Sequence, residues 1–390
     1  MMDFDFVSPT KIYFGKGKEK LVGQICSERN YQRVFVVIGQ GSVKKSGLLD
    51  IVLSSLTEYK VQYQLLEGVR PNPTIELCRQ GIQEARAFKP DLILAIGGGS
   101  VIDTAKNISV GYYYEGDSFD FNLHLVEPKN SLPVGVILTI SASGSELSTS
   151  SVIQDDKSQI KRGFNSDFNR PVFVIENPEL TYSVSKTQTA YGIVDIMMHT
   201  LERYFNPSKE NEPADGFAEA LLKSVVKAAR TVVDNPMDYE ARAVLMLMSS
   251  FSHNGLTSIG KGSLLYVHQL EHALSGVYPS VAHGAGLAVL FPAWAKYYVD
   301  FDTEKFNKLA INVFDLHNSN ALENAKAGIK EIEKLFSLLE MPKTLSDLGI
   351  NNPDIKRMVS LITNNGKNVV PHPAKDMDEK VLTEIFNSCL

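Results

Sequence analysis

The amino-acid sequence predicts an α/β domain with a mostly parallel sheet, followed by an all-helical domain. Up to about residue 180, short β-branched and aliphatic runs alternate with amphipathic stretches of helical periodicity, which is the order of βαβ units. Beyond about residue 181, helical periodicity continues without a convincing strand. We therefore expect two domains, residues 1–180 and 181–390, with a boundary near Asn177-Pro178, where proline disfavours helix at the preceding residue.

The predicted strands are short runs rich in Val, Ile and Leu, as expected of a sheet that helices cover on both faces. They are Arg33–Ile38, Val61–Leu65, Asp91–Ile96, Val134–Thr139 and Val172–Ile175. The helices expected between several of them are Ser42–Tyr59, Thr74–Phe88 and Ser100–Tyr113.

The second domain is expected to be a series of helices. Ser185 and Gln188 form a capping-box pattern at the start of the first one, and Gly276 followed by Pro279 ends another. The predicted helices are Tyr182–Phe205, Ala214–Val233, Tyr239–Asn254, Gly262–Ser275, Ala285–Val299, Thr303–Leu316 and Leu322–Leu339.

Composition and charge argue against several classes of protein. A net charge of −6 with dispersed Lys and Arg gives no footprint for nucleic acid or an anionic membrane. The cysteines, Cys26, Cys78 and Cys389, are far apart and odd in number, so they predict neither a disulfide framework nor a thiolate metal site. The first residues lack a signal-peptide pattern, and no apolar run approaches roughly 18 residues. We expect a cytoplasmic protein without a membrane span.

A glycine-rich turn, Gly97-Gly98-Gly99-Ser100, joins the apolar run 92–96 to a helical stretch. Glycines let the backbone approach a ligand, and a helix N-terminus offers N–H groups and partial positive charge to an anion. A tight turn alone would need fewer glycines, so a phosphate-binding turn is favoured. The motif is neither G-x-G-x-x-G nor a Walker A sequence.

A second polar turn, Ile140–Glu146, follows the run 134–139. Its hydroxyl groups could simply cap a helix. In an open parallel sheet, however, ligands bind at the carboxyl ends of strands near a switch in strand order. The two turns therefore support each other as parts of one binding site.

Histidine and aspartate residues in apolar surroundings predict a metal site. Asp195 and His199 are four residues apart, and so are His268 and His272, which places each pair on one helix face. One histidine alone is more often a satisfied core residue than a ligand. Carboxylate and imidazole without thiolate suit Fe²⁺, Zn²⁺ or another divalent ion. The spacing alone does not choose the histidine ligands among His253, His268, His272 and His283.

Taken together, these segments resemble the iron-containing (group III) alcohol dehydrogenases. The similarity runs over essentially the whole chain, and the glycine string with the histidine segments is highly specific. It is carried by Asn72-Pro73, by GGGSVIDTAK from Gly97 to Lys106, by Asp195 with His199, and by His268–Ser275 and His283–Ala288. The resemblance implies that the first domain binds a dinucleotide and that the second binds a metal ion and the substrate.

The resemblance also implies roles for individual residues. The metal, Fe²⁺ or alternatively Zn²⁺, would be bound by Asp195, His199, His268 and His283. His272 would stand near the nicotinamide and relay a proton, and His253 would be structural. In the cofactor site, Gly98, Gly99 and Ser100 beside Gly97 would hold the pyrophosphate, and Asp103 would stabilise that loop. Thr139 and Ser143 would line the cofactor cleft. Lys161 would approach the ribose or its 2′-phosphate.

The implied activity is hydride transfer between NAD(P)H and a small alcohol–aldehyde pair, with the metal polarising the substrate oxygen. Family members are often dimers, so we expect a homodimer. The turn Gly39-Gln40-Gly41-Ser42 carries no acid to bind ribose hydroxyls, and Gln40, Ser42 and the following lysines could accept a 2′-phosphate. NADP(H) is thus favoured over NAD(H), although these residues could merely cap the next helix.

This chain departs from the family pattern in three places. The interval from His268 to His283 is one residue longer than usual, and Leu264-Leu265 stand where Asp-Trp is frequent. Ser141 and Ser143 replace the commoner Thr and Gly. The last two departures are expected to bear on substrate preference.

Three rival interpretations remain at this point. One is a glycerol dehydrogenase-like enzyme on the same fold. A dehydroquinate synthase-like enzyme would need a dense basic pocket, whereas only Lys261 and Arg203 stand near the relevant segments. A non-catalytic dinucleotide-binding protein would be expected to have lost metal ligands, yet all four positions are filled.

Overall fold

The computed structural model describes residues 1–206, 211–262 and 264–390. The chain divides into two compact units, Val7–Val184 and a helical unit that combines Met1–Phe6 with Ser185–Leu390. Met1–Phe6 thus group with the later residues, and the Met2 N–H donates to the Gly260 carbonyl oxygen at 3.0 Å. Ser263, which lies in the predicted helix Gly262–Ser275, is outside the described residues.

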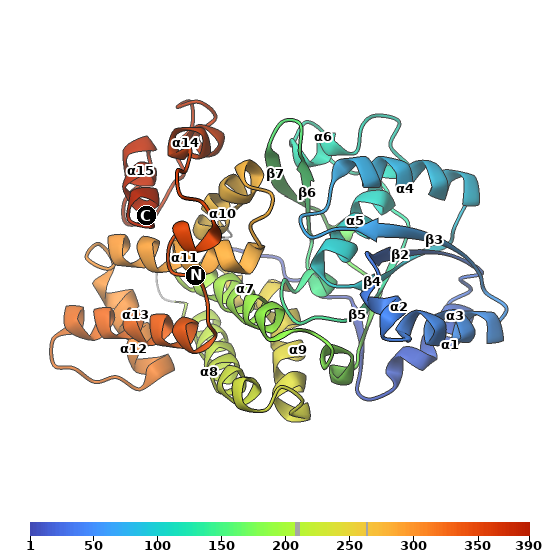
Figure 1. Ribbon diagram of the computed structural model, residues 1–390, viewed down its shortest axis with the longest axis horizontal. Coiled ribbons are helices and arrows are strands. Elements are labelled where there is room, and N and C mark those ends of the chain that lie inside the picture. The colour runs from blue at the N-terminus through green and yellow to red at the C-terminus, as the bar shows by residue number, and fades with distance from the viewer. Residues whose placement is uncertain (207–210, 263) are drawn as a thin grey trace. The chain divides into compact units, whose positions relative to one another are not determined.

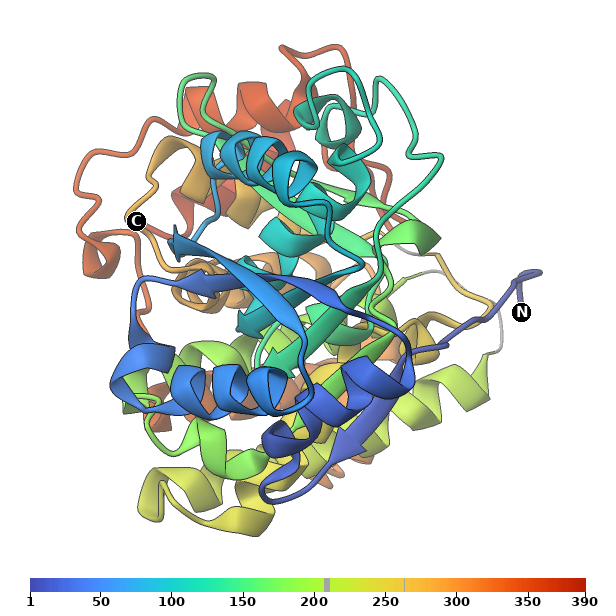
Figure 2. The same ribbon diagram turned by 90° about the vertical axis from the view of Figure 1, so that its right-hand side faces the viewer.

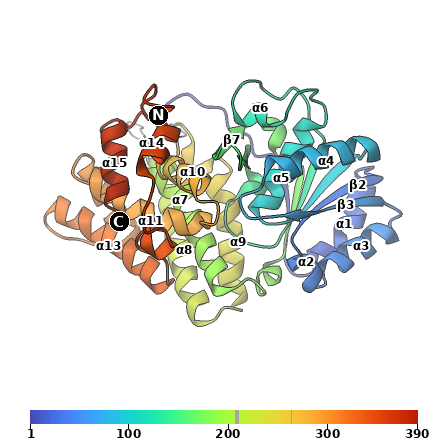
Figure 3. The same ribbon diagram turned by 45° about the horizontal axis from the view of Figure 1, so that its top comes forward.

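The α/β unit contains a six-stranded sheet in which every neighbouring pair of strands is parallel, so the predicted fold class is confirmed. Its strands, in spatial order, are β1 (Lys11–Phe14), β8 (Phe173–Glu176), β5 (Val134–Leu138), β4 (Leu92–Gly97), β2 (Arg33–Gly39) and β3 (Gln62–Val69). Helices α1 (Val22–Glu28) and α3 (Leu48–Glu58) cover one face, and α4 (Ile75–Phe88) and α5 (Gly99–Gly111) cover the other (Figures 2 and 3).

The strand order switches between β2 and β4, because the chain runs outward from β2 to β3 and then returns to the other side of β2. Ile38 pairs with Ile96, and Gly97 pairs with Leu138. The turns that follow β2, β4 and β5 therefore lie along one edge of the sheet. This is the edge where open α/β sheets bind ligands.

Several elements of this unit are absent from the sequence prediction. The antiparallel hairpin of β6 (Ser150–Asp155) and β7 (Ile160–Asn165) is largely polar, and β1 is a short, partly exposed edge strand. The single helix expected over 42–59 is two helices, α2 (Ser42–Lys45) and α3, because Gly47 adopts a left-handed φ of 76° between them. The hairpin and β1 are determined by strand pairing, and the break between α2 and α3 is determined by the turn at Gly47. Neither feature produces a periodic apolar pattern in the sequence.

The described residues of the helical unit form helices with no named strand among them, as predicted (Figure 1). Ser185 Oγ accepts the Gln188 N–H at 3.2 Å and caps the first helix, while Trp294 and Tyr266 lie in the core. No described helix is both long and apolar enough to cross a membrane. The helices are α7 (Lys186–Tyr204), α8 (Glu212–Asp234), α9 (Tyr239–His253), α10 (Tyr266–Val277), α11 (His283–Tyr298), α12 (Thr303–Phe314), α13 (Ala321–Leu338), α14 (Ile355–Thr363) and α15 (Glu379–Asn387), of which the sequence did not predict the last two.

Candidate metal centre and cofactor turn

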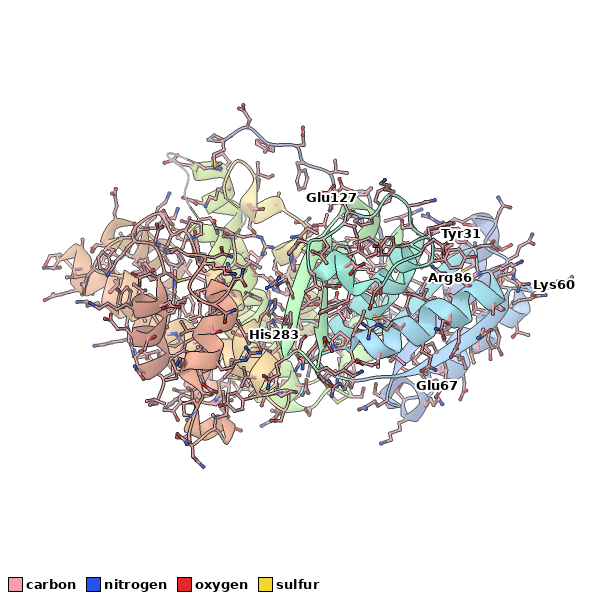
Figure 4. All side chains as sticks on the ribbon, turned by 90° about the horizontal axis from the view of Figure 1, so that it is seen from above. Tyr31, Lys60, Glu67, Arg86, Glu127 and His283 are labelled. Atoms are coloured by element: carbon pink, nitrogen blue, oxygen red, sulfur yellow. The ribbon has the colours of Figure 1, made fainter. Side chains whose placement is uncertain are left out.

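The four predicted metal ligands come together in the helical unit. Asp195 and His199 lie one turn apart on α7, and His268 lies on α10. His283, which is labelled in Figure 4, begins α11. Asp195 Oδ1 is 3.1 Å from His199 Nδ1, 3.5 Å from His268 Nε2 and 3.7 Å from His283 Nε2. Residues more than eighty positions apart in the chain thus surround one carboxylate oxygen.

These atoms are placed as if to share an ion. Asp195 Oδ1 and His268 Nε2 are both buried, and neither forms a hydrogen bond of acceptable geometry with any described residue. Atoms bound to one tetrahedral ion at about 2.1 Å lie about 3.4 Å from each other, close to the 3.5 and 3.7 Å that separate Asp195 Oδ1 from the Nε2 atoms of His268 and His283. A buried carboxylate without donors is costly unless a cation compensates it. The site therefore fits a first-row divalent ion.

The net charge of the buried groups around the cluster also favours a divalent cation. Asp195, Glu202 and Glu271 are buried carboxylates, and the Arg203 guanidinium buried beside them donates to the carbonyl oxygens of His199 and Ser252. Three carboxylates and one guanidinium carry a formal charge of −2. A divalent cation would neutralise it, which is the requirement for burying such charges.

Each ligand imidazole has its Nδ1 engaged, and the Nε2 atoms of His268 and His283 are the ring nitrogens that lie toward Asp195 Oδ1. His199 Nδ1–H donates to the Asp195 carbonyl oxygen at 3.1 Å, because a carbonyl oxygen can only accept. His268 Nδ1 hydrogen-bonds to Glu202, and His283 Nδ1 hydrogen-bonds to Glu271. The sequence prediction did not include these two acids, although each follows a leucine in an apolar helix and could have been noticed for that reason.

The electrostatics of the imidazoles differ. Burial lowers the pKa of His199 to about 3, which keeps this ring neutral and able to coordinate a metal. Burial also opposes charge on His268, but Glu202 and Asp195 outweigh it and raise the pKa of His268 to about 9. Asp195 keeps a pKa well below its usual value because His199 and His283 overcome the effect of burial. The buried carboxylates thus favour a positive charge between the proposed ligands.

The two remaining histidines lie beside the cluster. The His272 ring centroid is 6.2 Å from that of His268 and 5.8 Å from that of His283. The His253 ring, at the end of α9, lies with its centroid 4.1 Å from that of His199 and is tilted by 32° to it. The position of His272 near a nicotinamide stays a prediction, as does the structural role of His253.

In the α/β unit, the turn between β4 and α5 needs glycines because side chains there would overlap with neighbouring residues. The three glycines end β4 and begin α5, and the Gly98 φ of −101° is open to any residue. A Cβ on Gly98 would overlap Ile140, and one on Gly99 would overlap the Ser143 hydroxyl group. The two predicted binding turns therefore touch, and side chains in the first would separate them.

Asp103 and Lys106 attach α5 to the second turn and to the hairpin. Asp103 accepts from Ser145 Oγ at 2.6 Å and from a backbone N–H of β6 at 3.1 Å. The fully buried Lys106 Nζ donates to the carbonyl oxygens of Ser145, Ser148 and Ser150 at 2.6, 3.0 and 2.8 Å. Asp103 thus bonds to the second turn and to β6, and its expected role in stabilising the glycine turn stays a prediction. Lys106 was not singled out as a site residue.

The other predicted cofactor residues lie around the same edge. Gly39 ends β2, Gln40 follows it exposed, and Ser42 begins α2. The Thr139 N–H donates to the Gly97 carbonyl oxygen at 3.1 Å, and the Ser141 hydroxyl oxygen is buried without a hydrogen-bond partner among the described residues. These strand-end backbone groups and the Ser141 hydroxyl fit a polar ligand at the switch point.

Two lysines mentioned in the sequence analysis complete the description of the predicted cofactor residues. Lys161 is buried on β7, where it pairs in register with Gln154. Lys44 forms an ion pair with Glu67 of β3 at 2.5 Å, and Glu67 is labelled in Figure 4. The sequence prediction missed Glu67 because strand pairing, and not proximity in the chain, brings it beside the turn after β2.

We predict that Gly98→Ala weakens nicotinamide dinucleotide binding at least about tenfold, because the new methyl group would push the second turn away from the first and misplace the binding groups. Isothermal titration or cofactor fluorescence measures the change. Gly216→Ala, on α8 with open space around the new methyl group, is the matched control and should leave binding unchanged. Unaltered cofactor affinity in Gly98→Ala would contradict the assignment of this turn.

Comparison with known proteins gives the family. Residues 9–178 match the family model described as iron-containing alcohol dehydrogenase, and residues 189–390 match the C-terminal model of the Fe-containing alcohol dehydrogenase family. The chain belongs to the iron-containing alcohol dehydrogenase family. The resemblance seen in the sequence is confirmed, and membership makes the chain an NAD(P)H-dependent alcohol–aldehyde oxidoreductase.

Individual family members are similar over nearly the full length. NADH-dependent butanol dehydrogenase A of Clostridium acetobutylicum is 39% identical over 99% of both chains, and the NADPH-dependent aldehyde reductase YqhD of Escherichia coli is 31% identical over 94% of both. The crystal structure of NADH-dependent butanol dehydrogenase A from Thermotoga maritima superposes with a TM-score of 0.95 at 32% identity, covering 100% of this chain and 99% of that one.

The structure also bears on the synthase-like rival. The Arg203 guanidinium is held by backbone carbonyl groups, and Lys261 Nζ is paired with Asp215. Both cations that the sequence offered are thus engaged by protein groups.

Proposed function

We propose that this dehydrogenase reduces small aldehydes, and oxidises the corresponding alcohols, with a divalent ion held by Asp195, His199, His268 and His283. The observation that supports this assignment is the convergence of three imidazoles on the buried Asp195 oxygen. Fe²⁺ is the first candidate and Zn²⁺ the alternative, since both accept carboxylate and imidazole ligands. Assembly as a homodimer remains an expectation from the family resemblance.

The chain's own residues have separable roles. Asp195 and the neutral His199 present ligand atoms to an ion, which would supply Lewis acidity toward the substrate oxygen. The turns at Gly98 and Ser143 hold the dinucleotide, whose nicotinamide carries the hydride. His272, partly exposed on α10 beside the cluster, would move a proton to or from the substrate oxygen.

The substrate class rests on the relatives. Their names describe butanol dehydrogenases, an aldehyde reductase and 1,3-propanediol dehydrogenases, and butanol and 1,3-propanediol are short alcohols. A panel of linear aldehydes assayed after chelation and reloading with Fe²⁺ or Zn²⁺ would test this. Activity with butanal that returns on reloading is the expected result, and metal-independent turnover would refute the proposal.

We propose NADP(H) as the preferred cofactor, because the turn after β2 carries no acid that would repel a 2′-phosphate. The names of the relatives do not decide this, since they include both NADH-dependent and NADPH-dependent enzymes. The expected result is a higher kcat/KM for butanal reduction with NADPH than with NADH. Equal or better use of NADH would refute the preference.

A substitution at Gly39 sharpens that measurement. A Cβ there would make only ordinary contacts, 3.5 Å from the Val69 carbonyl oxygen, so an acid can be introduced without distorting β2. Gly39→Asp should lower kcat/KM with NADPH relative to NADH at least about tenfold through charge repulsion. Gly39→Asn has nearly the same shape without the charge and should shift the ratio much less.

A further inference from the structure

Two buried carboxylates surround the metal-binding cluster without belonging to the four proposed ligands. Glu202 on α7 and Glu271 on α10 are both 0% exposed. Each hydrogen-bonds to the Nδ1 of one proposed ligand, His268 and His283 respectively. Burying a carboxylate is costly unless it is paired, so their placement beside these rings requires a reason.

Glu202 fixes His268 through both the ring and the backbone. One carboxylate oxygen bonds to His268 Nδ1, while the other accepts the N–H groups of Val267 and His268 at 2.6 and 3.2 Å. Those N–H groups belong to the first turn of α10, which has no side-chain cap of its own. A single carboxylate therefore sets both the start of α10 and the orientation of its ligand ring.

Glu271 on α10 fixes His283 at the start of α11, where two glycines allow the helices to approach each other. A Cβ on Gly284 would overlap the backbone of Tyr191 on α7, and one on Gly286 would lie 3.0 Å from Glu271 Cγ. These glycines let the first turn of α11 approach both α7 and α10. The direct hydrogen bond between Glu271 and His283 also leaves no room for an ion between them, although these two residues with His272 form a second group of possible ligands.

We infer that Glu202 and Glu271 are positioning residues that aim the Nε2 atoms of His268 and His283 at Asp195 and provide charge that a divalent ion neutralises. This inference rests on the proposed function. It distinguishes these two rings from His199, whose Nδ1 donates to a neutral carbonyl group. Removing such an outer partner of a metal-binding histidine typically weakens metal affinity about 10- to 100-fold.

The test uses Glu271→Gln and Glu202→Gln, which keep an acceptor oxygen and the side-chain shape but remove the charge. Zn²⁺ affinity is measured on the full chain by competition with a chromophoric chelator, and ligand geometry by the visible spectrum of the Co²⁺-loaded protein. Each variant should bind Zn²⁺ about 10- to 100-fold more weakly than the parent, with an altered Co²⁺ spectrum. At saturating metal, KM for the aldehyde should change less than kcat.

Glu219→Gln is the control, because Glu219 is a partly buried acid that bonds Tyr204 and Asn312 away from the ligands. It should keep parental affinity. Since Glu202 also caps α10, loss of folding in its variant would leave Glu271→Gln to decide. Parental Zn²⁺ affinity and Co²⁺ spectrum in Glu271→Gln would overturn the inference. Failure of the parent to bind one ion per chain would instead refute the proposed metal site.

Discussion

Replacing His268 with alanine is expected to abolish specific metal binding and to reduce kcat/KM for aldehyde reduction at least roughly 10³-fold. The substitution removes the imidazole whose Nε2 lies 3.5 Å from Asp195 Oδ1 and leaves Glu202 without its ring partner. Lewis-acid stabilisation contributes several kcal/mol to the barrier, and each 1.4 kcal/mol is about a tenfold change in rate. Metal content after dialysis and steady-state kinetics provide the two measurements.

The control for this variant is His317→Ala. His317 is exposed and pairs only with the exposed Asp315 among the interactions described, so its loss should change neither metal content nor rate. Turnover retained in His268→Ala would refute the metal assignment. Lost turnover with one bound ion per chain would instead show that His268 acts on the reaction and not on binding of the ion.

Lys106→Met is expected to lower the free energy of unfolding of the α/β unit by about 3–5 kcal/mol, because three carbonyl oxygens lose a charged donor and each hydrogen bond to a charged group contributes about 1.5–3 kcal/mol. The ammonium group binds the carbonyl oxygens of Ser145, Ser148 and Ser150, which run from the second turn to β6, and its charge opposes that of the partly buried Asp103. Burial lowers the pKa of Lys106 to about 8, although Asp103 opposes this shift, so the charged form is present at neutral pH.

Urea titration followed by circular dichroism measures this effect as a lower midpoint. Lys129→Met is the control, because Lys129 is exposed in the loop before β5 and should leave the midpoint unchanged. Weaker dinucleotide binding should accompany the instability, since the second turn would lose its attachment to α5. An unchanged midpoint would mean that the buried ammonium group is not required to hold this loop.

The sequence predicted those elements whose pattern is local. The runs at β2, β4, β5 and β8 are buried on both faces and were recognised from their apolar residues alone. The hairpin of β6 and β7 was missed because its strands are polar and are defined by pairing with each other. The same distinction applies to α14, whose nine residues are too few for a reliable periodicity.

The candidate site shows a similar division. The spacing of Asp195 and His199 predicted that they share a helix face, and Asp195 Oδ1 lies 3.1 Å from His199 Nδ1. By contrast, Glu271 orients His283, twelve residues later, and Glu67 reaches Lys44 from the next strand. Such partners are determined by how helices and strands pack, so no spacing rule within one segment could have identified them.

The grouping of Met1–Phe6 with Ser185–Leu390 makes the α/β unit an insertion within the helical unit. During synthesis on a ribosome, all of Val7–Val184 is made before the helical unit is complete. The first six residues must wait until Gly260, the hydrogen-bond partner of Met2, has been made. A separately expressed helical unit would therefore need these six residues joined to Ser185 by a linker, because a polypeptide that begins at Ser185 would lack a segment that packs with it.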